Sequence, residues 1–128
     1  MYRIVLDTNV IVSALWSPGG PPARILAMLP AGRLTPYYDY EIMREYQSVL
    51  MRPKFKFSGE TTAAVIEMIE RRGYFVTAPT NNVAFADESD RKFYDVARFC
   101  GAALITGNER HFPREPFVMS PADFLARL

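Results

Sequence analysis

The chain has 128 residues, of which 49% are hydrophobic, and this is enough apolar mass for one domain with its own core. Lysine and arginine total 15 against 14 aspartates and glutamates, so any basic binding surface must be local. The single cysteine, Cys100, excludes an internal disulfide and fits a reducing compartment, for which the cytoplasm is the default expectation. Asp7 and Asn9 interrupt the early apolar run, which makes it too polar for a signal sequence or a membrane span.

Predicted strands and helices alternate along the chain. Residues 4–6 form an uninterrupted apolar run, typical of a strand buried on both faces of a parallel sheet, and a helix follows as far as Trp16. Further strands are expected within the segments LTPYYD, YFVTAP, ALIT and PFVMS. Further helices are expected over ARILAML (ending by Gly32), residues 40–51, SGETTAAVIEMIERRG, DESDRKFYDVARFCG and PADFLARL. This alternation predicts a single domain over residues 1–128, with a three-layer α/β/α sandwich and a mainly parallel central sheet.

Asp7 directly follows the first predicted strand. In open parallel sheets, ligands bind at the carboxyl ends of the strands, because the loops that leave this edge splay apart into a crevice. An aspartate here can also cap the next helix, and Asn9 can do the same. Both interpretations are open from this segment alone.

Helical spacing places two more acids at the border of the predicted core. Successive helical residues rotate by about 100°, so Glu45 lies beside the buried stripe that contains Val49, and Asp90 beside the stripe that contains Phe93. A solvated boundary position explains Glu45 taken singly, and helix capping explains Asp90. Capping does not explain why these acids and Asp7 come from three separate elements, each where core meets crevice.

The other acids near Asp90 have simpler explanations. Asp87 and Glu88 are expected to complement the dipole at the helix N-terminus. Asp95 is expected to project away from the core, where Arg91 or Arg98 would pair with it on the surface.

Four segments together resemble the PIN domain family, and specifically the VapC-like toxins of bacterial toxin–antitoxin pairs. They are VLDTNVIVSAL, EIMREYQSVLMRPKF, DESDRKFYDVA and LITGNERHFP, and they keep the family's order over essentially the whole chain. The resemblance implies that Asp7, Glu45 and Asp90 are the first, second and third metal-binding acids. Many PIN domains carry a fourth acid after the fourth strand, where this chain has Asn108, and this departure bears on the strength of a second metal site.

The resemblance implies a Mg²⁺- or Mn²⁺-dependent endoribonuclease. Clustered carboxylates repel one another until a divalent cation neutralises them, and such a cation can bind a phosphate oxygen and activate a water. Thr8, Asn9 and Thr106 are expected to orient the acids through hydrogen bonds. The resemblance also implies a cognate antitoxin as partner and a homodimer.

Contact with RNA is expected from local basic side chains. The candidates are Lys54 and Lys56 in the stretch RPKFKF, and Arg110, His111 and Arg114 near the end of the chain. A plain solvated role is the alternative for each, and His111 can equally be a packed loop residue.

Two other enzyme classes lack residues that they need. A dinucleotide-binding fold requires a glycine-rich turn after the first strand, where this chain has DTN. A phosphatase with an aspartyl nucleophile would resemble DxDxT, and Asn9 stands where the second aspartate belongs. The alternative that stays open is a PIN-like module that has lost catalysis and binds RNA or a protein partner, and Asn108 is the residue that keeps it open.

Overall fold

The computed structural model describes residues 2–128, in which five strands form one parallel sheet. The strand order is β3-β2-β1-β4-β5, and every pair of neighbours is parallel. The strands are β1 (Tyr2–Leu6), β2 (Leu34–Tyr38), β3 (Tyr74–Phe75), β4 (Ala103–Ile105) and β5 (Val118–Met119). The predicted parallel sheet is therefore confirmed.

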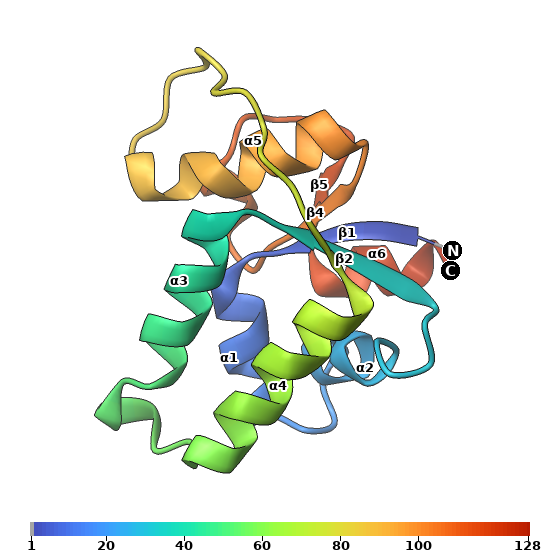
Figure 1. The fold of residues 1–128 in the computed structure, drawn as a ribbon. Helices are drawn as coiled ribbons and strands as arrows, with labels where there is room; N and C mark the ends of the chain where they lie inside the picture. Colours follow the sequence, from blue (N-terminus) through green and yellow to red (C-terminus); the bar gives the residue numbers. More distant parts are fainter. Residues whose placement is uncertain (1) are drawn as a thin grey trace.

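Helices cover both faces of this sheet (Figure 1). One face is covered by α5 (Arg91–Cys100). The helices on the other side are α1 (Thr8–Trp16), α2 (Pro21–Ala27), α3 (Tyr40–Leu50), α4 (Gly59–Arg72) and α6 (Pro121–Ala126). Three short 3₁₀ helices complete the chain: η1 (Pro53–Phe55), η2 (Glu88–Asp90) and η3 (Glu109–His111). The three-layer α/β/α architecture is as predicted, and no helix among residues 2–128 has both the length and the apolar character needed to cross a membrane.

Strand β1 is buried on both faces because it lies at the centre of the sheet. Ile4 and Val5 are fully buried, and Leu6 is nearly so. Leu6 is in register with Ile105 of the neighbouring β4. Since both strands run in the same direction, the residues that follow them, Asp7 and Thr106, leave the sheet side by side.

Three elements differ from their predicted extent. Only two residues of YFVTAP form β3, an edge strand that pairs with β2 alone. Helix α2 ends at Ala27 instead of reaching the predicted end near Gly32, because Pro30 disfavours helical backbone in the residue before it. The helix predicted over DESDRKFYDVARFCG starts as η2 and becomes α-helical only at Arg91, which leaves Asp90 at the junction.

Candidate functional site

The carboxylate of Asp7 is buried at the carboxyl edge of the sheet and held by a chain of hydrogen bonds. Asp7 is 7% exposed, and its Oδ2 accepts a hydrogen bond of 2.8 Å from Thr106 Oγ1. Thr106 Oγ1 in turn accepts from the backbone N–H of Asn108 at 2.9 Å. Because an ionised carboxylate can only accept hydrogen bonds, the hydroxyl proton of Thr106 is directed at Asp7. Thr106 therefore orients Asp7, whereas the Asn108 side chain is exposed.

Thr8 and Asn9 tie neighbouring elements to this edge. Thr8 Oγ1 donates a short hydrogen bond to Oε2 of Glu45, which joins the start of α1 to the middle of α3. Asn9 Oδ1 accepts from the backbone N–H of Gly107 at 3.3 Å and so links the loops that follow β1 and β4. Thr8 thus contacts a predicted metal-binding acid directly, while Asn9 acts on the loops.

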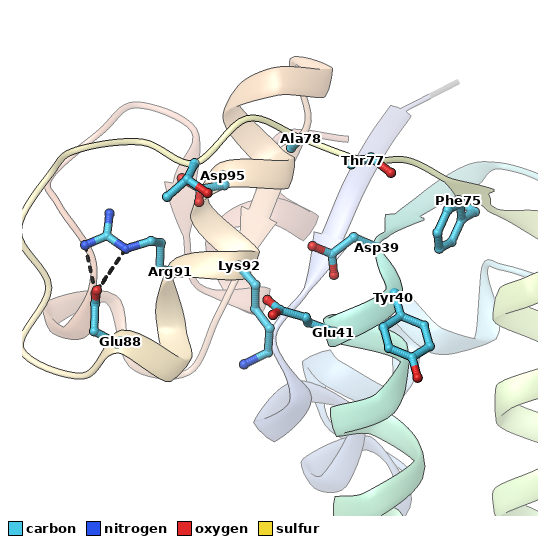
Figure 2. A pocket seen from close by; sticks show the side chains of 11 residues that line it. Asp39, Tyr40, Glu41, Phe75, Thr77, Ala78, Glu88, Arg91, Lys92 and Asp95 are labelled. Carbon is cyan, nitrogen blue, oxygen red and sulfur yellow. Dashed lines mark hydrogen bonds and ion pairs between the residues drawn. The ribbon is translucent and has the colours of Figure 1, made fainter.

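Glu45 is half-buried and lies between Thr8 and a lysine from the opposite layer. Lys92 Nζ lies 2.8 Å from Glu45 Oε1, and the Lys92 side chain is 11% exposed. Figure 2 shows Lys92 extending from α5 toward α3, where Glu41 lies beside it. Sequence analysis missed Lys92. The sequence feature that could have identified Lys92 is its position two residues after Asp90, in the first turn of α5.

Asp90 lies where η2 meets α5, and its side chain is 18% exposed. His111 Nδ1 of η3 lies 3.8 Å from its Oδ2. Asp90 occupies the N-cap position of α5 and makes no capping hydrogen bond. Asp7 occupies that of α1, where the Asn9 backbone amide lowers the pKa of the carboxyl without forming a full capping bond. Asp87 does cap, since it accepts from the Ser89 amide at 2.9 Å. Capping therefore accounts for Asp87 but not for Asp90.

The charges of neighbouring acids raise the pKa values of Asp7 and Asp90. Burial raises the pKa of Asp7 to about 6; the hydrogen bond from Thr106 opposes this, while the charges of Asp90 and Glu45 add to it. Burial likewise raises the pKa of Asp90, and the charges of Asp87 and Glu45 act in the same direction. His111 and Lys92 lower the pKa of Asp90. Asp7, Glu45 and Asp90 are thus near enough for their charges to interact, so negative charge accumulates at a cost at this edge of the sheet, which we call the crevice.

The crevice has the donor chemistry of a hard-cation site but not a closed coordination shell. Within residues 2–128, no three carboxylate, imidazole or thiol groups converge closely enough to make a formed metal centre. Both oxygens of Glu45 are also engaged, by Thr8 and by Lys92. Carboxylate oxygens that repel one another at partly buried positions suit Mg²⁺ or Mn²⁺. The residues therefore fit such a cation in their chemistry. Binding through Glu45 requires that its ion pair with Lys92 opens.

Beside the crevice lies a pocket of about 320 Å³, which Asp39, Lys92 and Asp95 help to line (Figure 2). The prediction that Asp95 lies on the surface was wrong. Asp95 is 9% exposed and accepts a hydrogen bond of 3.1 Å from the Asn81 amide, while Arg91 pairs with a glutamate instead. The irregular segment before η2 packs against this side of α5 and buries Asp95. Helical periodicity does not predict which distant segment packs on a helix.

The predicted RNA contacts fall into two separate places. Arg110 and His111 lie in η3, and His111 approaches Asp90 as described above. Lys54 and Lys56 lie in and just after η1, beyond the far end of α3 (Figure 1). The structure therefore brings His111 to the carboxylates but leaves both lysines away from them.

The family is identified by a comparison with family models. A family model described as PIN domain matches residues 3–110. The uncharacterized protein MJ1680 of Methanocaldococcus jannaschii is 30% identical over 110 residues, which cover 84% of this chain and 71% of that protein. The crystal structure of VapBC2 from Rickettsia felis, bound to a DNA fragment from their promoter, matches with a TM-score of 0.56 and 14% identity. That match covers 92% of this chain and 96% of the other, and at this identity it shows likeness of fold.

Proposed function

Because this chain belongs to the PIN domain family, we propose that it is a nuclease, and more specifically a Mg²⁺- or Mn²⁺-dependent endoribonuclease. In this proposal Asp7, Glu45 and Asp90 hold the cation, and RNA is cut by hydrolysis of a phosphodiester bond. The resemblance of four sequence segments to VapC-like toxins extends the proposal to a toxin of a toxin–antitoxin pair. The fold likeness to VapBC2 from Rickettsia felis agrees with this role.

The observation that supports a metal site most strongly is the mutual repulsion of the three acids at the carboxyl edge of the sheet. They come from the end of β1, the middle of α3 and the start of α5. The charges of Glu45 and Asp90 both raise the pKa of Asp7, and Asp90 makes no capping hydrogen bond to its helix. A divalent cation would relieve this repulsion, which is the physical reason for such an arrangement.

Each residue of the crevice has a distinct part in this hydrolysis. When bound, Mg²⁺ or Mn²⁺ would polarise a phosphate oxygen and lower the pKa of a water molecule. The Thr106 hydroxyl orients Asp7 and favours its ionised form. Thr8 fixes one oxygen of Glu45. Asn108 offers a neutral oxygen near the same edge, which attracts a cation less strongly than a fourth carboxylate would. Since water attacks phosphorus directly, no protein nucleophile is required.

A cognate antitoxin is the proposed regulatory partner. The Lys92–Glu45 ion pair supports this part of the proposal, because it places a cationic side chain against the carboxylates. An antitoxin segment carrying a basic side chain would bind the same acids and compete with manganese. If the antitoxin binds wild type and Asp7→Asn with equal affinity, inhibition works elsewhere. A homodimer and a cytoplasmic location complete the proposal.

A second candidate function is a PIN-like module that binds RNA or a protein partner without cutting RNA. Two observations favour it: Asn108 replaces the fourth acid, and Lys92 already neutralises Glu45. Both candidates retain the fold and the crevice, so only chemistry separates them.

The experiment is cleavage of a mixed-sequence single-stranded RNA by the purified protein. We expect cleavage with Mn²⁺ and none with excess chelator, and Asp7→Asn purified in the same way controls for contaminating nucleases. Single-stranded DNA of the same sequence tests the preference for RNA. Equal cleavage by wild type and Asp7→Asn, or no cleavage by either, would contradict the enzyme and favour the binding module.

A further inference from the structure

A basic and aromatic surface lies at the far end of α1 and α3 from the carboxylates. Its aromatic part joins the last residue of α1 to the segment that follows α3. We call it the basic–aromatic patch, and its members are Trp16, Arg52, Lys54, Phe55, Lys56 and Phe57.

The aromatic rings form one cluster. Trp16 meets Phe55 edge to face at 5.1 Å between centroids and Phe57 at 6.4 Å, and the two phenyl rings stack at 5.7 Å with an interplanar angle of 13°. Both phenylalanines are half-buried and pack against the core, whereas Trp16 is 59% exposed. The phenyl rings thus anchor an indole that stays largely open to solvent.

The backbone between the two rings is unusual. Lys56 has a φ of 57°, the left-handed region that residues other than glycine rarely adopt. It ends η1, and the phenyl rings on either side of it stack on each other while Lys56 itself is exposed. The turn therefore exposes a positive side chain between two residues whose rings both contact Trp16.

The charge of the patch is uniformly positive. Residues 46–59 include Arg52, Lys54 and Lys56 but no acidic residue. None of the three basic side chains forms an ion pair with any carboxylate of residues 2–128. Lys54 Nζ lies 5.1 Å from the centroid of the Phe55 ring instead. Positive charge interleaved with aromatic rings is the chemistry of sites that bind single-stranded nucleic acid.

Two helices connect the patch to the carboxylates. Helix α1 begins beside Asp7 and ends at Trp16, and α3 carries Glu45 and leads into η1 (Figure 1). The nine residues of α1 span about 13 Å at ~1.5 Å per residue. One bound strand of ~4 or more nucleotides, the usual site size of single-strand binders, would reach from one end to the other.

We propose that the basic–aromatic patch binds single-stranded RNA on one side of the scissile phosphate. A base stacks on Trp16, and Arg52, Lys54 and Lys56 contact phosphates. This inference rests on the proposed function for the identity of the nucleic acid. It adds an RNA-binding surface separate from the crevice and predicts tolerance of base identity at the stacked position, since every base has a π-face.

Trp16 is the only tryptophan of the chain, so its fluorescence reports on the patch alone. We would titrate the Asp7→Asn protein, in metal-free buffer, with a mixed-sequence single-stranded RNA, so that binding is read without cleavage. We expect saturable quenching of Trp16. Trp16→Leu, read by the anisotropy of labelled RNA, should bind about tenfold more weakly.

A matched pair of double variants tests the charges. Lys54→Gln with Lys56→Gln should weaken binding, and the slope of log affinity against log salt should fall by about 1.4. Arg24→Gln with Arg127→Gln removes the same charge from exposed positions on α2 and beside α6, and it should leave affinity and slope nearly unchanged.

The outcomes separate this inference from the proposed function. Absence of Trp16 quenching overturns the patch even if the protein cleaves RNA with Mn²⁺. Quenching without cleavage supports the patch and counts against the proposed enzyme. Trp16 emission that changes with protein concentration, together with self-association that RNA does not displace, would show that the patch is an interface between copies of the chain and would overturn it.

Discussion

The two ends of helix α3 differ in charge and in what neutralises that charge. The N-terminal half is capped by Asp39 and carries Glu41 and Glu45, and Lys92 reaches across from α5 to pair with Glu45. Beyond the C-terminal end, Arg52, Lys54 and Lys56 form no ion pair with a carboxylate of residues 2–128. The formal net charge of +1 gives no indication that acidic and basic residues gather at opposite ends of α3. The difference teaches that one end is suited to a cation and the other to a polyanion.

The largest expected effect comes from neutralising the acidic end. Glu45→Gln and Asp90→Asn should each lower Mn²⁺-dependent cleavage of RNA by roughly 100-fold or more, because each removes a charge that holds the cation. Initial rates under excess substrate measure this. Glu41→Gln is the control, since Glu41 is an exposed acid on the same helix. A comparable loss in Glu41→Gln would mean that general negative charge, not these acids, supports activity.

The next effect concerns the pH dependence of stability in the absence of metal. The pKa of Asp7 is about 6 in the folded protein and near 3.8 when the side chain is free, so ionisation of Asp7 disfavours the folded state. The free energy of unfolding should therefore rise as pH falls from 7 to 5, with roughly 1–2 kcal/mol of the rise due to Asp7. Urea unfolding of wild type and Asp7→Asn in chelator measures that contribution. Parallel pH profiles for the two proteins would contradict it.

A smaller effect is expected at Lys92, the cation that the fold itself supplies. Lys92→Met keeps the apolar stem and removes the charge that competes for Glu45, so Mn²⁺ should bind more tightly by roughly 1 kcal/mol, or about fivefold. Calorimetry measures the dissociation constant. Arg91→Met is the matched control, because Arg91 is the next residue but pairs with Glu88. Weaker Mn²⁺ binding in Lys92→Met would show that Lys92 positions Glu45 for the metal instead of competing with it.

The smallest effect is expected at Asn108, which is exposed at the edge of the crevice. Asn108→Asp replaces a neutral oxygen by a charged one and should lower the Mn²⁺ concentration for half-maximal cleavage a few-fold. In the wild type, Mn²⁺ should outperform Mg²⁺. A Mn²⁺ titration of wild type and Asn108→Asp side by side measures the effect, and superimposable curves would mean that Asn108 is not a metal ligand.

Local patterns in the sequence predicted the elements well where one segment held all the information. The apolar run before Asp7 predicted β1. The helices expected over SGETTAAVIEMIERRG and PADFLARL form as α4 and α6, where Ser58 and Ser120 cap the helices by accepting hydrogen bonds from the amides of Thr61 and Asp123. In each case the signal comes from neighbours in the chain, such as a side-chain oxygen three residues before an amide N–H.

Features that depend on distant segments were missed or mistaken. Asp95 was expected on the surface because helical spacing shows which face leaves the core, but not which loop covers that face. Lys92 and Glu45 pair across two helices, although the two residues are 47 positions apart in the sequence. Trp16 likewise meets Phe55 only in the folded protein. The end of the first predicted strand placed Asp7, and helical periodicity placed Glu45 and Asp90, at the edge of the core. Their metal-binding role is still a proposal.

The central claim is that Asp7, Glu45 and Asp90 act as one divalent-cation site. Calorimetric titration of the metal-free protein with Mn²⁺ tests it most directly, with Asp90→Asn compared with Asp87→Asn, three residues away. Both variants lose one charge, but Asp87 is an exposed cap of η2, whereas Asp90 raises the pKa of Asp7. We predict that wild type and Asp87→Asn bind Mn²⁺ with similar affinity and that Asp90→Asn loses measurable binding. Equal binding by all three proteins, or binding by none, would contradict the claim.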